Sequence, residues 1–352
     1  MNTKLLTITD PEVQLKEVQE AAEILKQGGL VAIPTETVYG LAGNGLNPQA
    51  VKNIFLAKGR PQDNPLIIHV ESSAQAEKYA AEIPAEYYEL CRRFSPGPLT
   101  VILKKKDCIP METSGGLDTV AIRIPSHPVA RAIIAAADLP IAAPSANLSG
   151  KPSPTSAQHC VDDLWGKVDA IVDGGDCMVG VESTVISLAE EKPILLRPGA
   201  VTAEQLREVL PELEIHQAVT GELEQGAKAT SPGMRYKHYS PNAKVTILNG
   251  STEAYTRFMA EQEQDGLYAL CFEEDVPGLS VPYIVWGSLQ DEDSQAQRLF
   301  SALRELDKLG AKKVYAHGPS REGVGLAVYN RLIRAAGFDE LDLSEEESEF
   351  LK

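Results

Sequence analysis

The chain has 352 residues, of which 43% are hydrophobic and 24% are charged, and its formal net charge is −17. A chain of this length is too long for one ordinary hydrophobic core, which favours two domains. The acidic balance argues against a protein that holds nucleic acid through a broad basic face.

Helical and strand-like patterns alternate from the N-terminus to residue 199. The spacing of apolar residues predicts helices over 11–29, 48–60, 73–83, 85–94 and 127–137. Short apolar runs predict strands within 30–43, 65–70, 99–105, 119–125, 140–147, 168–175, 182–188 and 193–199. Several of these strands follow one another without a helix, which favours a mixed sheet over a purely parallel one.

The pattern changes near residue 209. Residues 209–230 are polar and contain glycine, as is typical of a link between domains. Strands and helices then alternate regularly over 243–337, which predicts a smaller, Rossmann-like parallel α/β domain; it has no GxGxxG, so nucleotide binding there is not indicated. We therefore predict a first domain over 1–210, a linker over 211–241 and a C-terminal domain over 242–352.

Cysteine usage and hydropathy indicate the compartment. The five cysteines form no CxxC and no Cys/His cluster, so neither a structural zinc site nor a disulfide framework is expected. The N-terminus lacks the apolar run of a signal peptide, and Asp138 and Pro140 interrupt the long apolar stretch over 130–146. We expect a cytoplasmic protein without a membrane span.

Two polar clusters follow the first predicted elements. Thr35, Glu36, Thr37 and Tyr39 come directly after an apolar run. They are either hydroxyls at the ligand-binding edge of an α/β sheet or the capping groups of a turn. Lys58 and Arg60 flank a glycine, and two cations so close together suit a phosphate chain, although such pairs are often only solvated.

Further candidates lie in or after predicted strands. His69 is either a hydrogen-bonded core histidine or a ligand-binding residue. Arg123, in the run VAIRI, either faces solvent or is a buried cation that needs an anionic partner, for which a substrate carboxylate would serve. A series of small hydroxyl and amide side chains follows the strand near 141, and it suits a closely bound ligand: Ser145, Asn147, Ser149 and Ser153.

Several common catalytic motifs are missing. The sequence has no GxxxxGK[ST], HExxH or GxSxG, so P-loop phosphotransfer, zinc proteolysis and α/β-hydrolase chemistry lack their motifs. Cations, hydroxyls and amides suit binding and electrostatic stabilisation better than covalent catalysis.

A series of motifs in the first domain resembles the YrdC-type threonylcarbamoyl-AMP synthases. In chain order, these motifs are PTETVYGL, KGRP, DNPLIIHV, SPGPLTVIL, GLDTVAIRIP, PIAAPSANLSGKPSPTS, VDGG, GVESTVI and LLRPG. The segment SPGMRYKHYSP and the α/β domain after it resemble the long, two-domain form of that family. The resemblance covers the first domain and the linker, and it includes the family's KxR and SxN pairs at Lys58, Arg60, Ser145 and Asn147.

The resemblance implies a fold and a reaction. The first domain would be a twisted, open, mixed α/β sheet with a large concave cavity. L-Threonine, bicarbonate or CO2, and ATP would give threonylcarbamoyl-adenylate and pyrophosphate. A separate transferase would then place the threonylcarbamoyl group on the adenosine next to the anticodon of tRNAs, so stable direct tRNA binding by this protein is not expected.

The resemblance also implies site residues. The threonine site would comprise Thr37, His69, Arg123, Ala143 and Ser183. The ATP site would comprise Lys58, Arg60, Asn64, Thr119, Ser145, Asn147, Ser153, Arg197 and Tyr236. Lys58 and Arg60 would be catalytic, together with a Mg2+ held mainly by the ATP phosphates.

Alternatives to this interpretation remain open in the sequence. The segment 231–240 is either a loop that docks the second domain or, as the resemblance favours, a lid that brings Tyr236 nearest the nucleotide. The first domain could instead be an RNA-binding module without synthase activity, which the acidic charge disfavours. A carbamoyl-transferring maturation enzyme would need an acylphosphatase-like domain and zinc-finger cysteines, neither of which the sequence shows.

Overall fold

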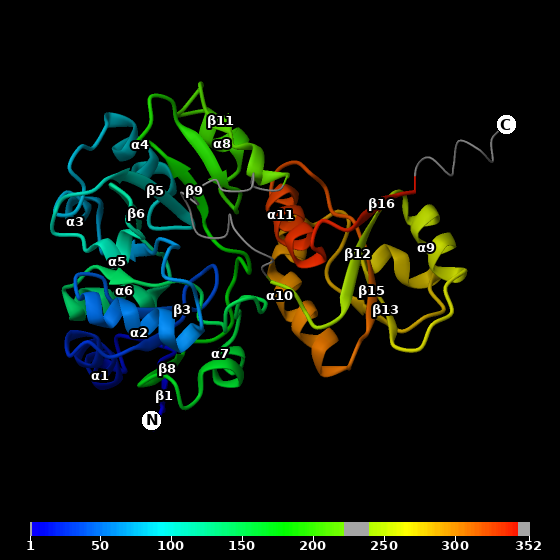
Figure 1. Ribbon diagram of the computed structural model, residues 1–352, viewed down its shortest axis with the longest axis horizontal. Helices are drawn as coiled ribbons and strands as arrows, with labels where there is room; N and C mark the ends of the chain where they lie inside the picture. The colour runs from blue at the N-terminus through cyan, green and yellow to red at the C-terminus, as the bar shows by residue number, and fades with distance from the viewer. Residues whose placement is uncertain (1, 222–238, 344–352) are drawn as a thin grey trace. The chain divides into compact units, whose positions relative to one another are not determined.

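The computed structural model describes residues 2–221 and 239–343. These residues form two compact units, one of 2–149 with 153–221 and one of 150–152 with 239–343 (Figure 1). Each unit is built on its own sheet.

The first unit combines many short strands with helices. Its strands are β1 (Lys4–Thr7), β2 (Val31–Ile33), β3 (Gly40–Asn44), β4 (Ile67–His69), β5 (Leu99–Lys104), β6 (Thr119–Arg123), β7 (Ile141–Ala142), β8 (Ala170–Asp173), β9 (Thr184–Ser187), β10 (Ile194–Arg197) and β11 (Glu214–Ile215). Its helices are α1 (Leu15–Lys26), α2 (Pro48–Lys58), α3 (Ser73–Ala76), α4 (Ala85–Phe94), α5 (Met111–Ser114), α6 (Pro128–Ala137), α7 (Ala157–Leu164), α8 (Ala203–Arg207) and the 3-10 helix η1 (Gln217–Val219).

The strands of the first unit form one mixed sheet in the order β1-β8-β2-β3-β7-β4-β6-β5-β9-β10-β11. β4 pairs with β6 in parallel, whereas β5 pairs with β6 in antiparallel orientation. Apolar side chains of α1 and α6 pack with β2 and β8 in one cluster, and those of α2 and α7 pack in another. The predicted mixed α/β sheet is confirmed.

Helix α2 shows how the local sequence positions two candidate residues. Asn47 caps its N-terminus by accepting hydrogen bonds from two backbone N–H groups, and Pro48 occupies the first turn. The helix ends at Lys58 because Gly59 adopts a left-handed conformation with φ of 61°. Lys58 therefore projects from the last helical turn, and Arg60 lies in the loop beyond it.

The structure differs from the sequence prediction over 73–83, where only Ser73–Ala76 is helical. Ala80 instead forms a bridge with Lys105, and the backbone N–H of Ala81 donates to the carbonyl of Lys104 at 2.8 Å. Pairing with the end of β5 thus replaces helix continuation. Within the segment predicted as linker, β11 pairs in parallel with β10.

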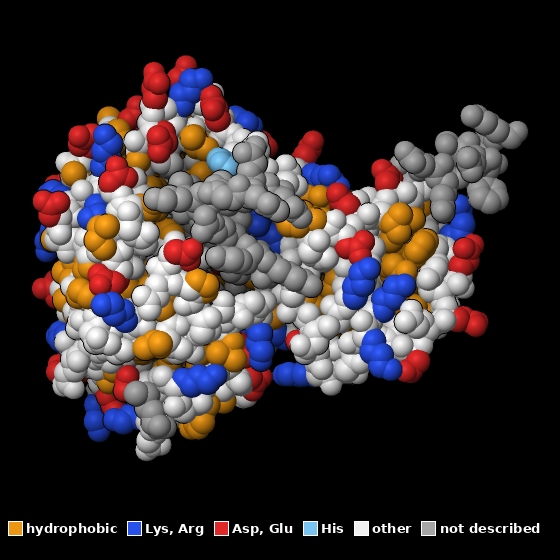
Figure 2. All heavy atoms as spheres, viewed as in Figure 1, with side chains coloured by type: hydrophobic (Ala, Val, Ile, Leu, Met, Phe, Trp, Pro, Cys, Tyr) orange, Lys and Arg blue, Asp and Glu red, His pale blue; other side chains and the backbone are white. Residues whose placement is uncertain are grey.

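Charged side chains of both signs are interspersed over the face of the first unit that Figure 2 shows. Within the described residues, no helix is both long and apolar enough to cross a membrane.

The second unit contains β12 (Lys244–Asn249), α9 (Thr252–Ala260), β13 (Leu267–Cys271), the 3-10 helix η2 (Glu273–Gly278), β14 (Tyr283–Val285), α10 (Glu292–Lys308), β15 (Lys313–His317), α11 (Gly325–Ala336) and β16 (Glu340–Asp342). Its sheet has the order β14-β13-β15-β12-β16, and every pair is parallel. Helix α9 lies on one side of this sheet and α10 and α11 on the other (Figure 1). The predicted parallel α/β domain is confirmed.

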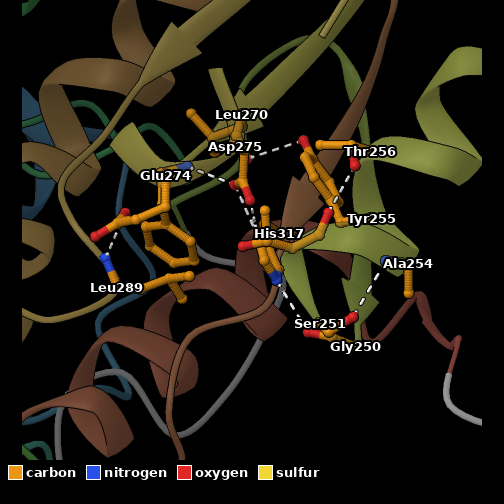
Figure 3. Close-up of polar contacts among 12 residues, drawn as sticks. Gly250, Ser251, Ala254, Tyr255, Thr256, Leu270, Glu274, Asp275, Leu289 and His317 are labelled. Atoms are coloured by element: carbon orange, nitrogen blue, oxygen red, sulfur yellow. Dashed lines mark hydrogen bonds and ion pairs between the residues drawn. The ribbon is translucent and has the colours of Figure 1, made fainter. Parts of the chain in front are cut away.

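A buried polar network lies at the carboxyl ends of β12 and β15 in the second unit (Figure 3). His317 Nδ1 lies 2.8 Å from Asp275 Oδ2, and His317 Nε2 lies 3.1 Å from the carbonyl oxygen of Gly250. The ring of Tyr255 stacks on His317 with a centroid distance of 4.6 Å. The network joins η2 to the end of β15 and to the turn that follows β12.

Candidate functional site

A row of polar side chains crosses three neighbouring strands of the first unit. His69 at the end of β4 is the register partner of Arg123 at the end of β6, and Arg123 is the partner of Thr100 in β5. Paired residues on neighbouring strands project their side chains from the same face of a sheet. All three side chains are buried, so this face carries a polar row inside the protein.

The row continues across β9 to β10. The hydroxyl oxygens of Thr100 and Ser183 lie 2.8 Å apart. Arg197, at the end of β10, donates through Nε to the carbonyl of Ser183 at 3.0 Å and through Nη2 to its hydroxyl at 3.1 Å. The predicted threonine-site residues His69, Arg123 and Ser183 are thus brought together, and Thr100 links them.

Arg123 has an anionic partner within the protein. Glu36 Oε1 lies 2.8 Å from Arg123 Nη2, and both side chains are buried. The two atoms are close enough for an ion pair, but their alignment does not satisfy hydrogen-bond geometry. Glu36 Oε2 accepts a hydrogen bond from the backbone N–H of Ser126 at 3.2 Å. Of the two alternatives for Arg123, the structure selects the buried cation and supplies its counter-charge from Glu36.

Burial and charge shift the ionisation of this group. Burial acts to raise the pKa of Glu36, but the Arg123 charge and the hydrogen bonds to the carboxylate outweigh it, and the pKa is lowered from its usual value. Burial first, and then the Arg123 charge, lower the pKa of His69 to about 3. Glu36 is therefore an anion and His69 a neutral imidazole at neutral pH.

The segment between β2 and β3 brings Glu36 and Thr37 to the row. The hydroxyl oxygens of Thr35 and Thr37 lie 2.9 Å apart, and Thr35 donates to the carbonyl of Val38 at 2.6 Å. The hydroxyl of Thr35 therefore also stabilises the turn, which was one of the two alternatives that the sequence left open. The carbonyl oxygens of Glu36 and Thr37 accept from the backbone N–H groups of Val179 and Gly180.

Ala143 and Ser145 lie beside the start of β3. Gly40 forms a bridge with Ser145, and a Cβ at Gly40 would approach the Ala143 side chain to 3.1 Å. The close approach explains why a glycine begins β3. It places the predicted threonine-site residue Ala143 and the predicted nucleotide-site residue Ser145 at one edge of the hairpin.

The KxR and SxN pairs meet through Lys58. Its Nζ donates to the backbone carbonyls of Ser145 and Asn147, the latter at 2.6 Å, and contacts Asn147 Oδ1 at 3.3 Å. Ser145 also donates to Asn147 Oδ1 at 2.6 Å. Burial, and then the charge of Arg60, lower the pKa of Lys58 well below its usual range. These contacts make Lys58 a residue that holds the loop of Ser145 and Asn147.

The remaining predicted nucleotide-site residues are spread over several elements. Ser153 is buried and donates to Glu182 Oε1 at 2.5 Å. Asn64 is buried, and its Oδ1 has no hydrogen-bond partner in the described part of the chain. Thr119 begins β6 and is the register partner of Lys104. Tyr236 lies outside the described residues.

Sequence reasoning missed three participants: the pairing of Glu36 with Arg123, the bridging hydroxyl of Thr100, and Glu182. Glu36 stands inside the quoted PTETVYGL and Glu182 inside GVESTVI. Each is the one charged residue of its motif, and this could have indicated that the two glutamates take part in the site.

One groove on the described surface of the first unit, of about 650 Å³, is lined by residues that include Leu30, Leu56 and Leu148 and by none of the predicted site residues. The predicted concave cavity at the polar row stays a prediction. No group of three or more His, Cys, Asp or Glu side chains within 2–221 and 239–343 could hold a metal ion.

Comparison with known proteins covers most of the chain. A family model described as "Telomere recombination" (Sua5, YciO and YrdC) matches residues 23–199, and one described as "Threonylcarbamoyl-AMP synthase, C-terminal domain" matches 201–337. The threonylcarbamoyl-AMP synthase of Pyrococcus abyssi is 47% identical over 92% of this chain and 94% of its own length. That of Bacillus subtilis is 44% identical over 95% of this chain and 96% of its own.

A solved structure agrees with these matches. The crystal structure of P. abyssi Sua5 complexed with L-threonine has a TM-score of 0.89 and 42% sequence identity, and the match covers 97% of this chain and 99% of that one. With both family models, these relatives and this structure in agreement, the chain belongs to the threonylcarbamoyl-AMP synthase family.

Proposed function

We propose that this protein synthesises L-threonylcarbamoyladenylate from L-threonine, bicarbonate or CO2, and ATP, and releases pyrophosphate. The observation that carries the proposal is the buried polar row of His69, Arg123 and Ser183, which suits a small polar ligand, in a chain whose relatives carry this enzyme's name. The solved relative complexed with L-threonine supports the choice of amino acid.

The threonine site of the proposal consists of Thr37, His69, Arg123, Ala143 and Ser183. Arg123 binds the carboxylate, because a guanidinium is the usual partner of that group. Neutral His69 and the hydroxyls of Thr37 and Ser183 offer hydrogen bonds to the remaining polar atoms. The side chains of this site are buried, so the bound ligand would be withdrawn from water.

The nucleotide site of the proposal lies at the loop that Lys58 holds and at the end of β10. It comprises Arg60, Asn64, Thr119, Ser145, Asn147, Ser153, Arg197 and, outside the described residues, Tyr236. Mg2+ enters with ATP, held by the phosphates. Arg60 neutralises charge on the phosphates, and Lys58 either does the same or acts by fixing Ser145 and Asn147.

The reaction requires no covalent enzyme intermediate. The threonine amine attacks CO2 and loses a proton, which gives an N-carboxylate. An oxygen of that carboxylate attacks the α-phosphorus of ATP, the bond to the β-phosphate oxygen breaks, and pyrophosphate leaves. Orientation of the reactants can supply much of the rate, since effective molarities reach about 10⁵ M or more. A separate transferase then moves the threonylcarbamoyl group to tRNA.

The proposal is tested with L-threonine, labelled bicarbonate and Mg-ATP. We expect a labelled adenylate together with pyrophosphate, and no pyrophosphate when threonine is omitted. Replacing Arg60 with Ala should lower the rate of pyrophosphate release about 100-fold or more while the fold persists. Pyrophosphate release without threonine, or full activity of the Arg60→Ala variant, contradicts the proposal.

A further inference from the structure

Four buried polar atoms around the Glu36–Arg123 pair have no hydrogen-bond partner in the part of the chain that the structure describes. They are Glu36 Oε1, Arg123 Nε, Arg123 Nη2 and His69 Nδ1. The exposed fractions of the three residues are 6%, 5% and 2%. Folded proteins rarely leave buried polar atoms without a hydrogen bond. Four such atoms in one place, two of which contact each other only as an ion pair, indicate a polar ligand.

The charges of the site restrict that ligand. Arg123 already faces an anion, so a ligand with a carboxylate alone would have to compete with Glu36 for the guanidinium. The atoms without a hydrogen-bond partner include an anionic acceptor, Glu36 Oε1, and two cationic donors, Arg123 Nε and Nη2, of which Nη2 forms an ion pair with Oε1. An α-amino acid matches this pair, because it carries a donor amine and an acceptor carboxylate on neighbouring atoms.

The backbone fixes the orientation of Glu36. Its Oε2 accepts from the Ser126 N–H at 3.2 Å, which leaves Oε1 as the oxygen beside Arg123. Its own carbonyl is held by the N–H of Val179 at 2.8 Å. The carboxylate is therefore positioned from both ends, and its lowered pKa keeps it an acceptor at neutral pH.

We infer that Glu36 is the amine-binding residue of the threonine site: its carboxylate accepts a hydrogen bond from the α-amine of L-threonine, while Arg123 donates to the α-carboxylate. This inference rests on the proposed function, which supplies threonine as the ligand. It adds an acidic residue to a site otherwise made of a cation, an imidazole and hydroxyls, and it makes recognition of the amine depend on charge.

The test compares two ligands by titration calorimetry on the full chain. One is L-threonine, and the other is the 2,3-dihydroxybutanoate of matching configuration, in which a hydroxyl replaces the amine. Glu36→Gln should weaken threonine binding about 10-fold or more, since hydrogen bonds between charged groups are strong. The same variant should bind the dihydroxy acid as well as the wild type or better, because no anion then competes for Arg123.

A matched control and a second variant complete the design. Glu208→Gln removes an exposed ion pair with Arg93 at 2.8 Å and should leave both affinities unchanged. If Glu36→Gln does not fold, Glu36→Asp serves instead, because it keeps the charge on a shorter side chain. Glu36→Asp should weaken the binding of threonine more than the binding of the dihydroxy acid.

Three outcomes have distinct meanings. Equal losses for both ligands overturn the inference, because Glu36 would then act only by positioning Arg123. Unchanged threonine binding by Glu36→Gln overturns it as well. A wild-type protein that does not bind threonine contradicts the proposed function instead.

Discussion

At the scale of single residues, the site depends on charges that are buried but balanced. Glu36 and Arg123 neutralise one another, and His69 stays neutral beside them because burial and the Arg123 charge both disfavour its protonation. A buried pair of this kind is weak evidence for stability as such, but removal of one partner leaves the other charge uncompensated.

Glu36 should make the stability of the first unit depend on acid pH. Its pKa in the folded state is below the usual value of 4.5, so its ionised form stabilises the fold. That contribution is present above the unfolded pKa and is lost as the pH falls through the folded pKa. We expect Glu36→Gln to lower the free energy of unfolding at pH 7 by about 3 kcal/mol.

Urea unfolding from pH 7 to pH 3 measures this effect. The difference in the free energy of unfolding between the wild type and Glu36→Gln should decrease as the pH falls below about 4.5. A difference that is constant over the whole range would contradict an ionised Glu36 in the folded protein.

His69 should remain neutral in the folded protein well below the usual histidine pKa of 6.5, since its pKa is lowered to about 3. Its contribution to stability is complete above pH 6.5 and is lost as the pH falls from 6.5 towards 3. NMR of the histidine rings, with His69→Gln to assign the signal, should show no titration of His69 between pH 8 and 5. A midpoint near 6.5 would place the ring in water.

At the scale of elements, the longer helices of the first unit lie where the spacing of apolar residues predicts them. α4 coincides with its predicted range, and α2 and α6 agree with theirs to within two residues at each end. β1 and α7 were not predicted. β1 has four residues, three of them exposed, so its alternation is too short to recognise.

The site could be predicted only in part, for a physical reason. His69, Arg123 and Ser183 stand in motifs that carry the family resemblance, and the structure brings them into one row. The partner of Arg123 lies 87 positions earlier in the chain, and no local pattern encodes that contact. Tertiary pairing of charges therefore had to come from the structure.

The left-handed Gly59 should link helix stability to nucleotide binding. A Cβ at this position would meet no atom within 4 Å, but φ of 61° disfavours any residue with a side chain. Gly59→Ala should cost about 1–2 kcal/mol and raise the KM for ATP by shifting Arg60. Asn47→Ala removes the cap at the other end of the same helix, at a cost of about 1 kcal/mol, and should leave the KM unchanged. Equal effects of both variants on KM would mean that helix stability alone matters.

At the scale of the whole molecule, the two units have separate sheets and separate apolar clusters. Some relatives match only part of the chain. The putative threonylcarbamoyl-AMP synthase of Methanocaldococcus jannaschii aligns with 55% of this chain and 93% of its own length. A relative can therefore match nearly its whole length with little more than half of this chain.

Residues 1–230 should therefore fold without the rest of the chain. We expect this fragment to unfold cooperatively, as followed by circular dichroism, and to make the adenylate more slowly or lose it faster to water than the full chain does. A fragment that aggregates would show that the first unit needs the second. A fragment with full activity would remove the linker and second unit from the proposed reaction.

The net charge of the molecule gives an expectation for RNA. With −17 overall and charges of both signs interspersed on the face that Figure 2 shows, we expect weak binding of tRNA in filter assays at 150 mM salt. Tight binding that falls steeply with salt concentration would instead favour the RNA-binding alternative.

The polar row also has a consequence for biosynthesis. Its members come from widely separated positions in the chain. The last two are Ser183, directly before β9, and Arg197, at the end of β10. β5 pairs with β9, which lies 85 positions later in the chain, so the row is complete only after β9 has been synthesised. Contacts so distant in sequence form late in folding. On the ribosome, a chain of this protein acquires its candidate site only after about the first two hundred residues have emerged, so ligand binding would report completion of the first unit.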